Sequence, residues 1–232
     1  MRSDVDGSGD SGSGYPADAD PEAAARGGLY ALAARAFTEP DPELYEALAS
    51  GALDAKCRAL LDRSGLDVDP PDLTTDDGRP RLCARYNDLF VVGHTVVEDR
   101  TDGTIDAEGP AVSLYESAYR PDASWTDVNL DLARAYDHFG VEVDEERREN
   151  HDHLRLQLEF AGFLCRREAV VDERAARARL DFLDRHLAVC ADGVADALAD
   201  EPGTDVFGEL GQFVARLVRA DTADLDDRLE GR

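Results

Sequence analysis

Apolar residues recur at helical spacing along most of the chain and are densest between Leu154 and Cys165. At about 100° per residue they form two stripes, Leu154, Leu158, Ala161 and Cys165 on one and Leu156, Phe160, Phe163 and Leu164 on the other. A helix that is apolar around most of its girth lies in the middle of an α-helical protein. The pattern therefore predicts a central helix, and a polar cluster at residues 149–153 stands at its N-terminal end.

Further segments carry the same periodicity. They cover approximately residues 21–37, 42–48, 53–64, 75–93, 126–139, 172–201 and 206–217. The first of them opens with Asp20-Pro21-Glu22, which supplies an N-cap, a proline at the first helical position and an acidic first turn. No stretch alternates between apolar and polar residues for more than a few positions. We predict an all-α fold, a single helical-bundle domain of about eight helices.

The folded domain is expected to occupy residues 21–220. Residues 1–20 are rich in Gly, Ser and Asp, a composition typical of a disordered tail. Residues 221–232 are polar and are expected to form a C-terminal tail.

Helical periodicity fails between residues 94 and 121, which we interpret as a long central connection. Such connections inside compact domains are uncommon and often functional. This one carries Tyr115, Glu116, Ser117 and Tyr119 and leads towards the central helix. The tyrosines either belong to a site or attach the loop to the core.

The chain has 25 basic and 51 acidic residues, a formal net charge of −26. Such a surface repels nucleic acid and anionic membranes. Because the carboxylates are spread over the whole chain, we interpret the charge as halophile-like adaptation to a salty cytosol. Attraction of a cationic partner is a compatible alternative. No apolar run reaches the roughly 18 residues of a membrane span, and no secretory signal opens the chain, so we expect a cytoplasmic protein.

Common catalytic signatures are missing from the sequence. The four cysteines form no CxxC pair, which argues against a zinc ribbon or a thioredoxin-like site. No P-loop, dinucleotide-binding, zincin or nucleophile-elbow motif occurs. We therefore expect no catalytic residue, no metal and no cofactor.

The polar cluster before the central helix could form a metal site, cap the helix or provide a hydrogen-bonding histidine. His151 and His153 point in different directions on a helix, so one metal ion takes at most one of them, together with Glu149. A small metal-dependent hydrolase centred on these three residues is one alternative. Asp152 in a first helical turn is also explained by capping, worth about 0.3–1 kcal/mol. A charged His153 gains nothing there, so we expect it to be neutral and available for one hydrogen bond.

Four blocks of residues occur in the order found in one family. The first resembles the E-x-P-D-H-L and L-E-F signature of the TorD/DmsD chaperones; it is Glu149-x-x-Asp152-His153-Leu154, followed by Leu158-Glu159-Phe160. The other three are Tyr86-x-x-Leu89-Phe90, Glu116-Ser117-Ala118-Tyr119 and Phe182-Leu183-x-x-His186-Leu187. The chain departs from the pattern at His151, where the family usually has proline, and at Cys190, where a tryptophan is frequent.

The resemblance implies a cytoplasmic chaperone of molybdopterin oxidoreductases of the dimethyl sulfoxide reductase type. Its partners would be the twin-arginine signal peptide and the apo-form of the client, and it would be a monomer or a domain-swapped dimer. A related alternative is the assembly factor of a respiratory nitrate reductase.

Site residues carried over from the family fall into three groups. Tyr86, Leu89 and Phe90 would line the apolar part of a peptide groove, although plain core packing explains Leu89 and Phe90 equally well. Glu149, Asp152 and His153 would supply the polar part, since a carboxylate takes a guanidinium bidentately. Glu116 and Ser117 would lie on the rim.

Overall fold

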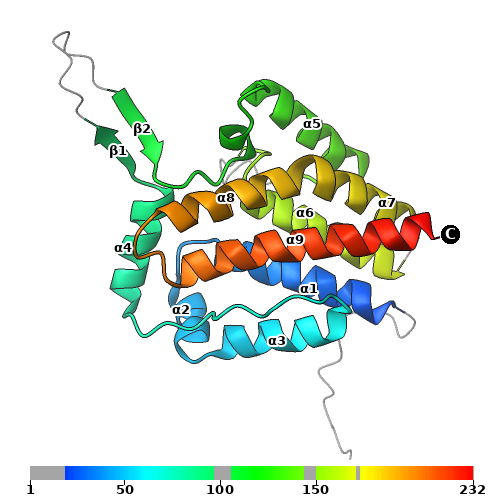
Figure 1. Cartoon of the computed structure of the whole chain (residues 1–232), viewed down its shortest axis with the longest axis horizontal. Helices are drawn as coiled ribbons and strands as arrows, with labels where there is room; N and C mark the ends of the chain where they lie inside the picture. The colour runs from blue at the N-terminus through cyan, green and yellow to red at the C-terminus, as the bar shows by residue number, and fades with distance from the viewer. Residues whose placement is uncertain (1–18, 97–105, 144–149, 171–172, 232) are drawn as a thin grey trace, which may run out of the picture.

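A computed structural model describes residues 19–96, 106–143, 150–170 and 173–231, and it is a bundle of helices with one small hairpin (Figure 1). The elements are α1 (Pro21–Ala36), α2 (Pro42–Ala49), α3 (Ala52–Ser64), α4 (Arg79–Phe90), β1 (Gly93–Val96), β2 (Asp106–Pro110), the 3-10 helix η1 (Glu116–Tyr119), α5 (Trp125–His138), α6 (Leu154–Val170), α7 (Glu173–Phe182), the π-helical turn η3 (Leu183–Leu187), α8 (Ala188–Asp200) and α9 (Val206–Glu230). Because α7, η3 and α8 form one continuous helix, the all-α prediction of about eight helices is confirmed.

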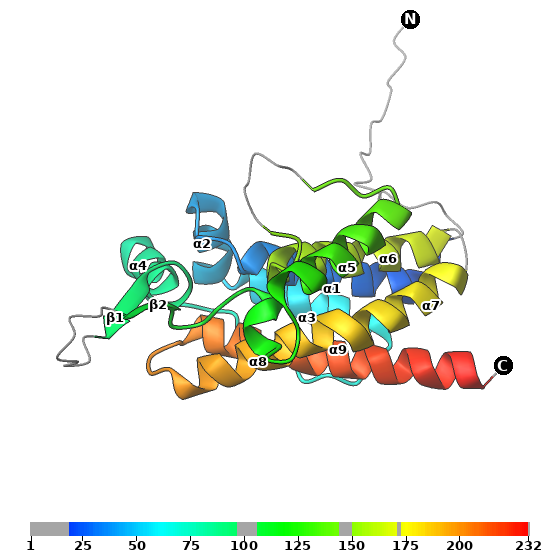
Figure 2. The same cartoon turned by 90° about the horizontal axis from the view of Figure 1, so that it is seen from above.

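The central helix of the sequence pattern is α6. It packs against α1 and α7 in the interior, which the two views in Figures 1 and 2 show. The closest approach to α1 is made by two glycines. A Cβ on Gly27 would lie 3.1 Å from the carbonyl oxygen of Gly162, and one on Gly162 would lie 3.2 Å from that of Gly27. The two backbones therefore cross at a distance that larger side chains would increase.

The start of α1 agrees with the sequence prediction. Asp20 Oδ1 accepts hydrogen bonds from the backbone N–H groups of Glu22 and Ala23, at 2.9 and 3.3 Å. Pro21 occupies the first helical position. The Asp20 N–H also donates to the carbonyl of Ala169 at 2.9 Å, which joins the beginning of α1 to the end of α6.

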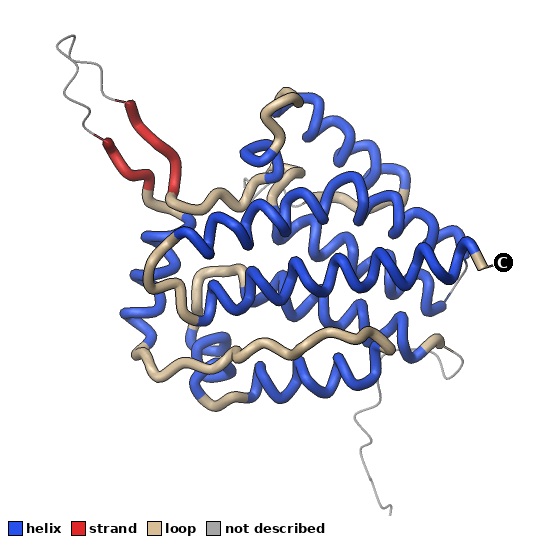
Figure 3. The backbone as a smooth tube through the Cα atoms, viewed as in Figure 1, coloured by secondary structure: helices blue, strands red, loops and turns tan. Residues whose placement is uncertain are grey.

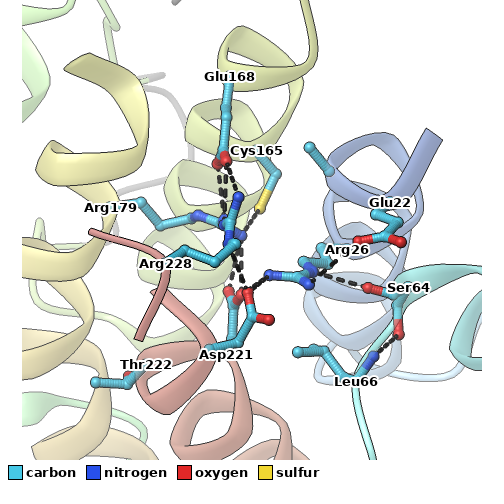
Figure 4. Close-up of polar contacts among 12 residues, drawn as sticks. Glu22, Arg26, Ser64, Leu66, Cys165, Glu168, Arg179, Asp221, Thr222 and Arg228 are labelled. Atoms are coloured by element: carbon cyan, nitrogen blue, oxygen red, sulfur yellow. Dashed lines mark hydrogen bonds and ion pairs between the residues drawn. The ribbon is translucent and has the colours of Figure 1, made fainter. Parts of the chain in front are cut away.

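The prediction of a C-terminal tail at residues 221–232 is wrong, because α9 continues to Glu230. Asp221 is fully buried and lies in a charged cluster between helices (Figure 4). It accepts from Tyr30 Oη and Arg179 Nη1, both at 2.8 Å, and from Arg26 Nη1 at 3.1 Å. These polar residues resemble a solvated tail in sequence, but partners on α1 and α7 neutralise Asp221 inside the bundle.

The connection between residues 94 and 121 contains a hairpin that periodicity did not predict. β1 and β2 pair antiparallel, with Gly93 opposite Pro110 and Thr95 opposite Ala107. The hairpin projects from the helical body beside α4 (Figure 3). Both strands are too short to show an alternating pattern, and their pairing is a tertiary property.

The described parts of the chain include no helix with the length and apolar character that a membrane span requires. Residues 1–18, most of the tail expected at the N-terminus, lie outside the described residues.

Candidate functional site

A short stretch, residues 112–117, joins the predicted site blocks to each other; we call it the bridging segment. Three backbone hydrogen bonds hold it, from Val112 N to Leu89 O at 2.8 Å, from Leu154 N to Leu114 O at 2.7 Å and from Glu116 N to Asp152 O at 3.0 Å. It therefore runs from the end of α4 to the start of α6. This arrangement brings the third sequence block against the first and attaches the second block to them through Val112.

Asp152 fixes the bridging segment rather than capping the central helix. Its Oδ2 accepts from the backbone N–H of Ser117 at 3.1 Å, in the first turn of η1. The expected position in the first turn of the central helix is wrong, since α6 begins at Leu154. Asp152 is fully buried, and among the described residues its Oδ1 has no hydrogen-bond partner. An unsatisfied buried acceptor costs about 1–3 kcal/mol, so this oxygen is suited to a further donor.

His153 takes the N-cap position of α6. Its Nδ1 accepts a hydrogen bond from the backbone N–H of Arg155 at 3.1 Å. A ring nitrogen that accepts is unprotonated, so the imidazole is neutral and carries its proton on Nε2, which agrees with the expectation from the helix dipole. The ring meets Tyr115 edge to face, with centroids 5.0 Å apart.

Glu116 is buried, not on a rim. Its Oε2 accepts from Gln157 Nε2 at 2.9 Å, and His186 Nδ1 lies 3.1 Å from its Oε1. Arg120 forms an ion pair with the same carboxylate. This side chain of η1 is thus held by α6 and η3 together, and burial of its charge depends on these donors.

His186 is a residue that the sequence analysis did not assign to the site. Its Nε2 lies 3.2 Å from Asp131 Oδ2 on α5, while its Nδ1 contacts Glu116. The signal was present, because His186 is the histidine of the fourth family block. Its neighbours in space, Glu116 and Asp131, however, lie 70 and 55 residues away, and local sequence patterns do not reveal such contacts.

Tyr86 and Phe90 pack with Phe37 and Phe207 in an aromatic cluster between α1, α4 and α9, and Leu89 of α4 is buried in the core. The Phe90 ring centroid lies 5.2 Å from that of Tyr86 and 5.6 Å from that of Phe207. Tyr86 Oη donates to the carbonyl of Phe37 at 3.3 Å. These residues anchor the end of α4, from which Leu89 O holds the bridging segment. Glu149 lies outside the described residues.

A concave surface lies between α5, α6 and residues 141–143; we call it the α5–α6 groove. It has a volume of about 370 Å³ and is lined by Tyr136, Val141, Glu142, Val143, Arg155, Leu156, Glu159, Phe160, Phe163 and Arg166. Glu159 and Phe160 belong to the first sequence block. Tyr136 Oη donates to the carbonyl of His151 at 2.9 Å, so the backbone of the residue in the family's proline position holds one side chain of the groove wall.

The described residues include no group of three or more His, Cys, Asp or Glu that is arranged to hold a metal ion. The His151 ring lies against Tyr136, with centroids 5.9 Å apart, and His153 Nδ1 already accepts a hydrogen bond. The two histidines of the hydrolase alternative are therefore used in packing and capping.

Comparisons with known proteins agree with one another. A family model described as nitrate reductase delta subunit matches residues 42–195. The selenate reductase assembly chaperone of Thauera selenatis is 32% identical, and the alignment covers 90% of this chain and 92% of that protein. The chlorate reductase assembly chaperone of Ideonella dechloratans is 30% identical with the same coverage. The perchlorate reductase assembly chaperone of Dechloromonas aromatica is 27% identical over 84% of this chain and 88% of that protein.

Proposed function

The chain belongs to the nitrate reductase delta subunit family, and we propose that it is an assembly chaperone of a molybdopterin oxidoreductase. Membership confirms the resemblance to molybdoenzyme chaperones that the four blocks indicate. The observation that carries the proposal is the likeness over 90% of the chain to relatives named as assembly chaperones. Such a protein binds its client without making or breaking a bond, so it needs no catalytic residue.

The finer proposal is that the α5–α6 groove receives a twin-arginine leader. Apolar walls of Tyr136, Val141 and Phe163 suit the hydrophobic segment of a leader peptide. Glu142 and Glu159 lie on the same groove; Glu159 is half exposed and forms an ion pair with the buried Arg155 at 2.6 Å, so a leader arginine would share this carboxylate with Arg155. A carboxylate takes a guanidinium through two parallel hydrogen bonds, which favours arginine over lysine.

The predicted polar residues would act mainly by holding this groove in shape. Asp152 and Glu116 are fully buried, so leader arginines reach them only when the bridging segment moves. The unpartnered Asp152 Oδ1 supports a second stage in which an arginine enters. Before an arginine enters, Tyr86, Leu89 and Phe90 would anchor the bridging segment. Asp152 would hold that segment at Ser117, and His153 would cap α6. Direct contact between Glu149 and the leader remains a prediction.

The test is a titration of a labelled twin-arginine leader peptide against the wild type and Glu159→Gln. Loss of one charge-assisted hydrogen bond costs about 1.5–3 kcal/mol, so we expect the affinity to fall by roughly tenfold or more. A leader with Lys-Lys in place of Arg-Arg should bind more weakly to the wild type. The matched control Asp196→Asn, on the exposed face of α8, should change the affinity less than about twofold.

Equal binding of a scrambled peptide would contradict leader recognition. If Glu159→Gln binds the leader with unchanged affinity, the arginine-binding site lies outside this groove. Asp152→Asn separates the two stages, because it should slow or weaken binding while circular dichroism still reports a folded helical protein.

A second candidate, an assembly factor of a respiratory nitrate reductase, is favoured by the description of the matching family model. Co-expression separates the candidates. The protein is co-expressed with the apo catalytic subunit of each candidate client. It should raise the yield of active enzyme only for the reductase that is its own client.

A further inference from the structure

A second concave surface lies between α5, α6, α7 and η3; we call it the arginine groove. Its volume is about 480 Å³. The floor is aromatic, with the rings of Phe160 and Phe182 in edge contact at 4.9 Å and Phe139 5.8 Å from Phe160. Phe160 also lines the α5–α6 groove, so the two grooves meet at this residue.

Four arginines surround the aromatic floor, each from a different element. They are Arg134 of α5, Arg167 of α6, Arg174 of α7 and Arg185 of η3, and all four are exposed. Two carboxylates also line the groove. With neutral histidines the lining therefore has a formal charge of +2, whereas the whole chain has −26.

Two of the four arginines on this rim, Arg134 and Arg167, have no carboxylate partner among the described residues. Arg185 pairs with both carboxylates, Asp131 at 2.5 Å and Asp181 at 3.4 Å. Arg134 forms no ion pair with any described residue, and Arg167 lies over the Phe139 ring at 5.7 Å without a carboxylate partner in the described ranges. Many other arginines of the bundle, such as Arg26 and Arg58, are paired with carboxylates. The rim thus has cationic groups available above an apolar floor.

We propose that the arginine groove binds an acidic segment of the client protein, in which carboxylate side chains flank an aromatic or aliphatic residue. The inference rests on the proposed chaperone function and adds a second contact to it. Charge complementarity selects the occupant, because an acidic segment is repelled by a chain with a net charge of −26 and attracted by the cationic lining of this groove. A twin-arginine leader carries the same sign of charge as this rim and is repelled by it, so the two client elements bind in different grooves.

The experiment uses the full chain and a probe of defined chemistry. The probe is an N-acetylated, C-amidated peptide of alternating glutamate and phenylalanine, and its counterpart has lysine in place of glutamate. Binding is measured by calorimetry at low and high NaCl for the wild type, Arg134→Glu and Arg63→Glu. Arg63 is an exposed arginine of α3, outside the groove, so it provides the same charge change elsewhere.

The wild type should bind the glutamate peptide and not the lysine peptide, with an affinity that falls as salt rises. Arg134→Glu should weaken binding by about tenfold or more, and Arg63→Glu by less than about twofold. Arg174→Glu, on the opposite wall, should repeat the loss. Because Arg134 is exposed and has no ion pair in the described structure, its replacement should leave the helical circular dichroism unchanged.

Three results would overturn the proposal. They are equal affinity of both peptides, an unchanged affinity in Arg134→Glu, or binding of inorganic pyrophosphate in the groove without binding of the peptide, which would make it a small-anion site. Leader binding is measured on the same variants. If Arg134→Glu binds the leader normally while no variant binds the acidic peptide, only this inference fails; loss of leader binding by the wild type would instead count against the proposed function.

Discussion

The carboxylate of Glu116 lies 3.1 Å from Nδ1 of His186, seventy residues further along the chain. His186 Nε2 continues this contact to Asp131 on α5, at 3.2 Å. The pair therefore joins the bridging segment to the wall of the arginine groove, which His186 lines. These contacts connect η1, η3 and α5 through the two side chains.

Glu116→Gln should destabilise the protein by about 1–3 kcal/mol, because the neutral amide no longer balances Arg120 and offers donors where His186 and Gln157 need an acceptor. Urea unfolding followed by circular dichroism measures the change. The matched control is Glu46→Gln on the exposed face of α2, expected to stay within about 0.5 kcal/mol. Equal effects of the two variants would mean that Glu116 is solvated.

Gly162→Val should weaken the crossing of α1 and α6. The added side chain meets the Gly27 carbonyl at 3.2 Å and Tyr30 Cβ at 3.4 Å, and overpacking of this kind typically costs about 1–3 kcal/mol. Ala31→Val, on the exposed face of α1, controls for the β-branched side chain. Thermal unfolding should show a lower midpoint for Gly162→Val alone.

Removal of residues 221–232 should cost at least about 3–5 kcal/mol, because Arg26 and Arg179 would remain buried without the carboxylate of Asp221. Removal of residues 229–232 leaves that cluster intact and should change the stability by less than about 0.5 kcal/mol. Denaturant unfolding of both truncated chains provides the comparison. Similar stabilities would show that the last turns of α9 contribute nothing to the fold.

Acid should weaken the same cluster through Asp224. Burial by itself would raise the pKa of this carboxyl, but the hydrogen bond and charge of Arg26, with the charge of Arg228, outweigh it and hold the pKa below its ordinary value of 3.8. A depressed pKa in the folded state contributes stability above the unfolded pKa, and this contribution is lost as the pH falls through the folded value.

Asp224→Asn should accordingly be less stable than the wild type at pH 6, and the difference should shrink below about pH 4. Unfolding curves of both proteins between pH 6 and pH 3 give the measurement. A difference that does not vary with pH would assign the effect to lost packing or hydrogen bonding rather than to the charge.

The helical architecture could be predicted from the sequence because its causes are local. The stripes of α6 and the Asp20-Pro21 start of α1 depend on residues within a few turns of one another, and each family block is a short run of neighbouring residues. The same local information supports the neutral state of His153 at a helix start.

Only the tertiary structure decided which polar residues are inside. Glu116 was expected on a rim and Asp221 in a tail, yet both are fully buried. Their burial depends on donors far away in sequence, such as His186 for Glu116 and Arg26 for Asp221, which are 70 and 195 residues distant. A sequence pattern states which face of a helix is apolar, whereas a buried charge is tolerated only where the fold brings an opposite charge to it.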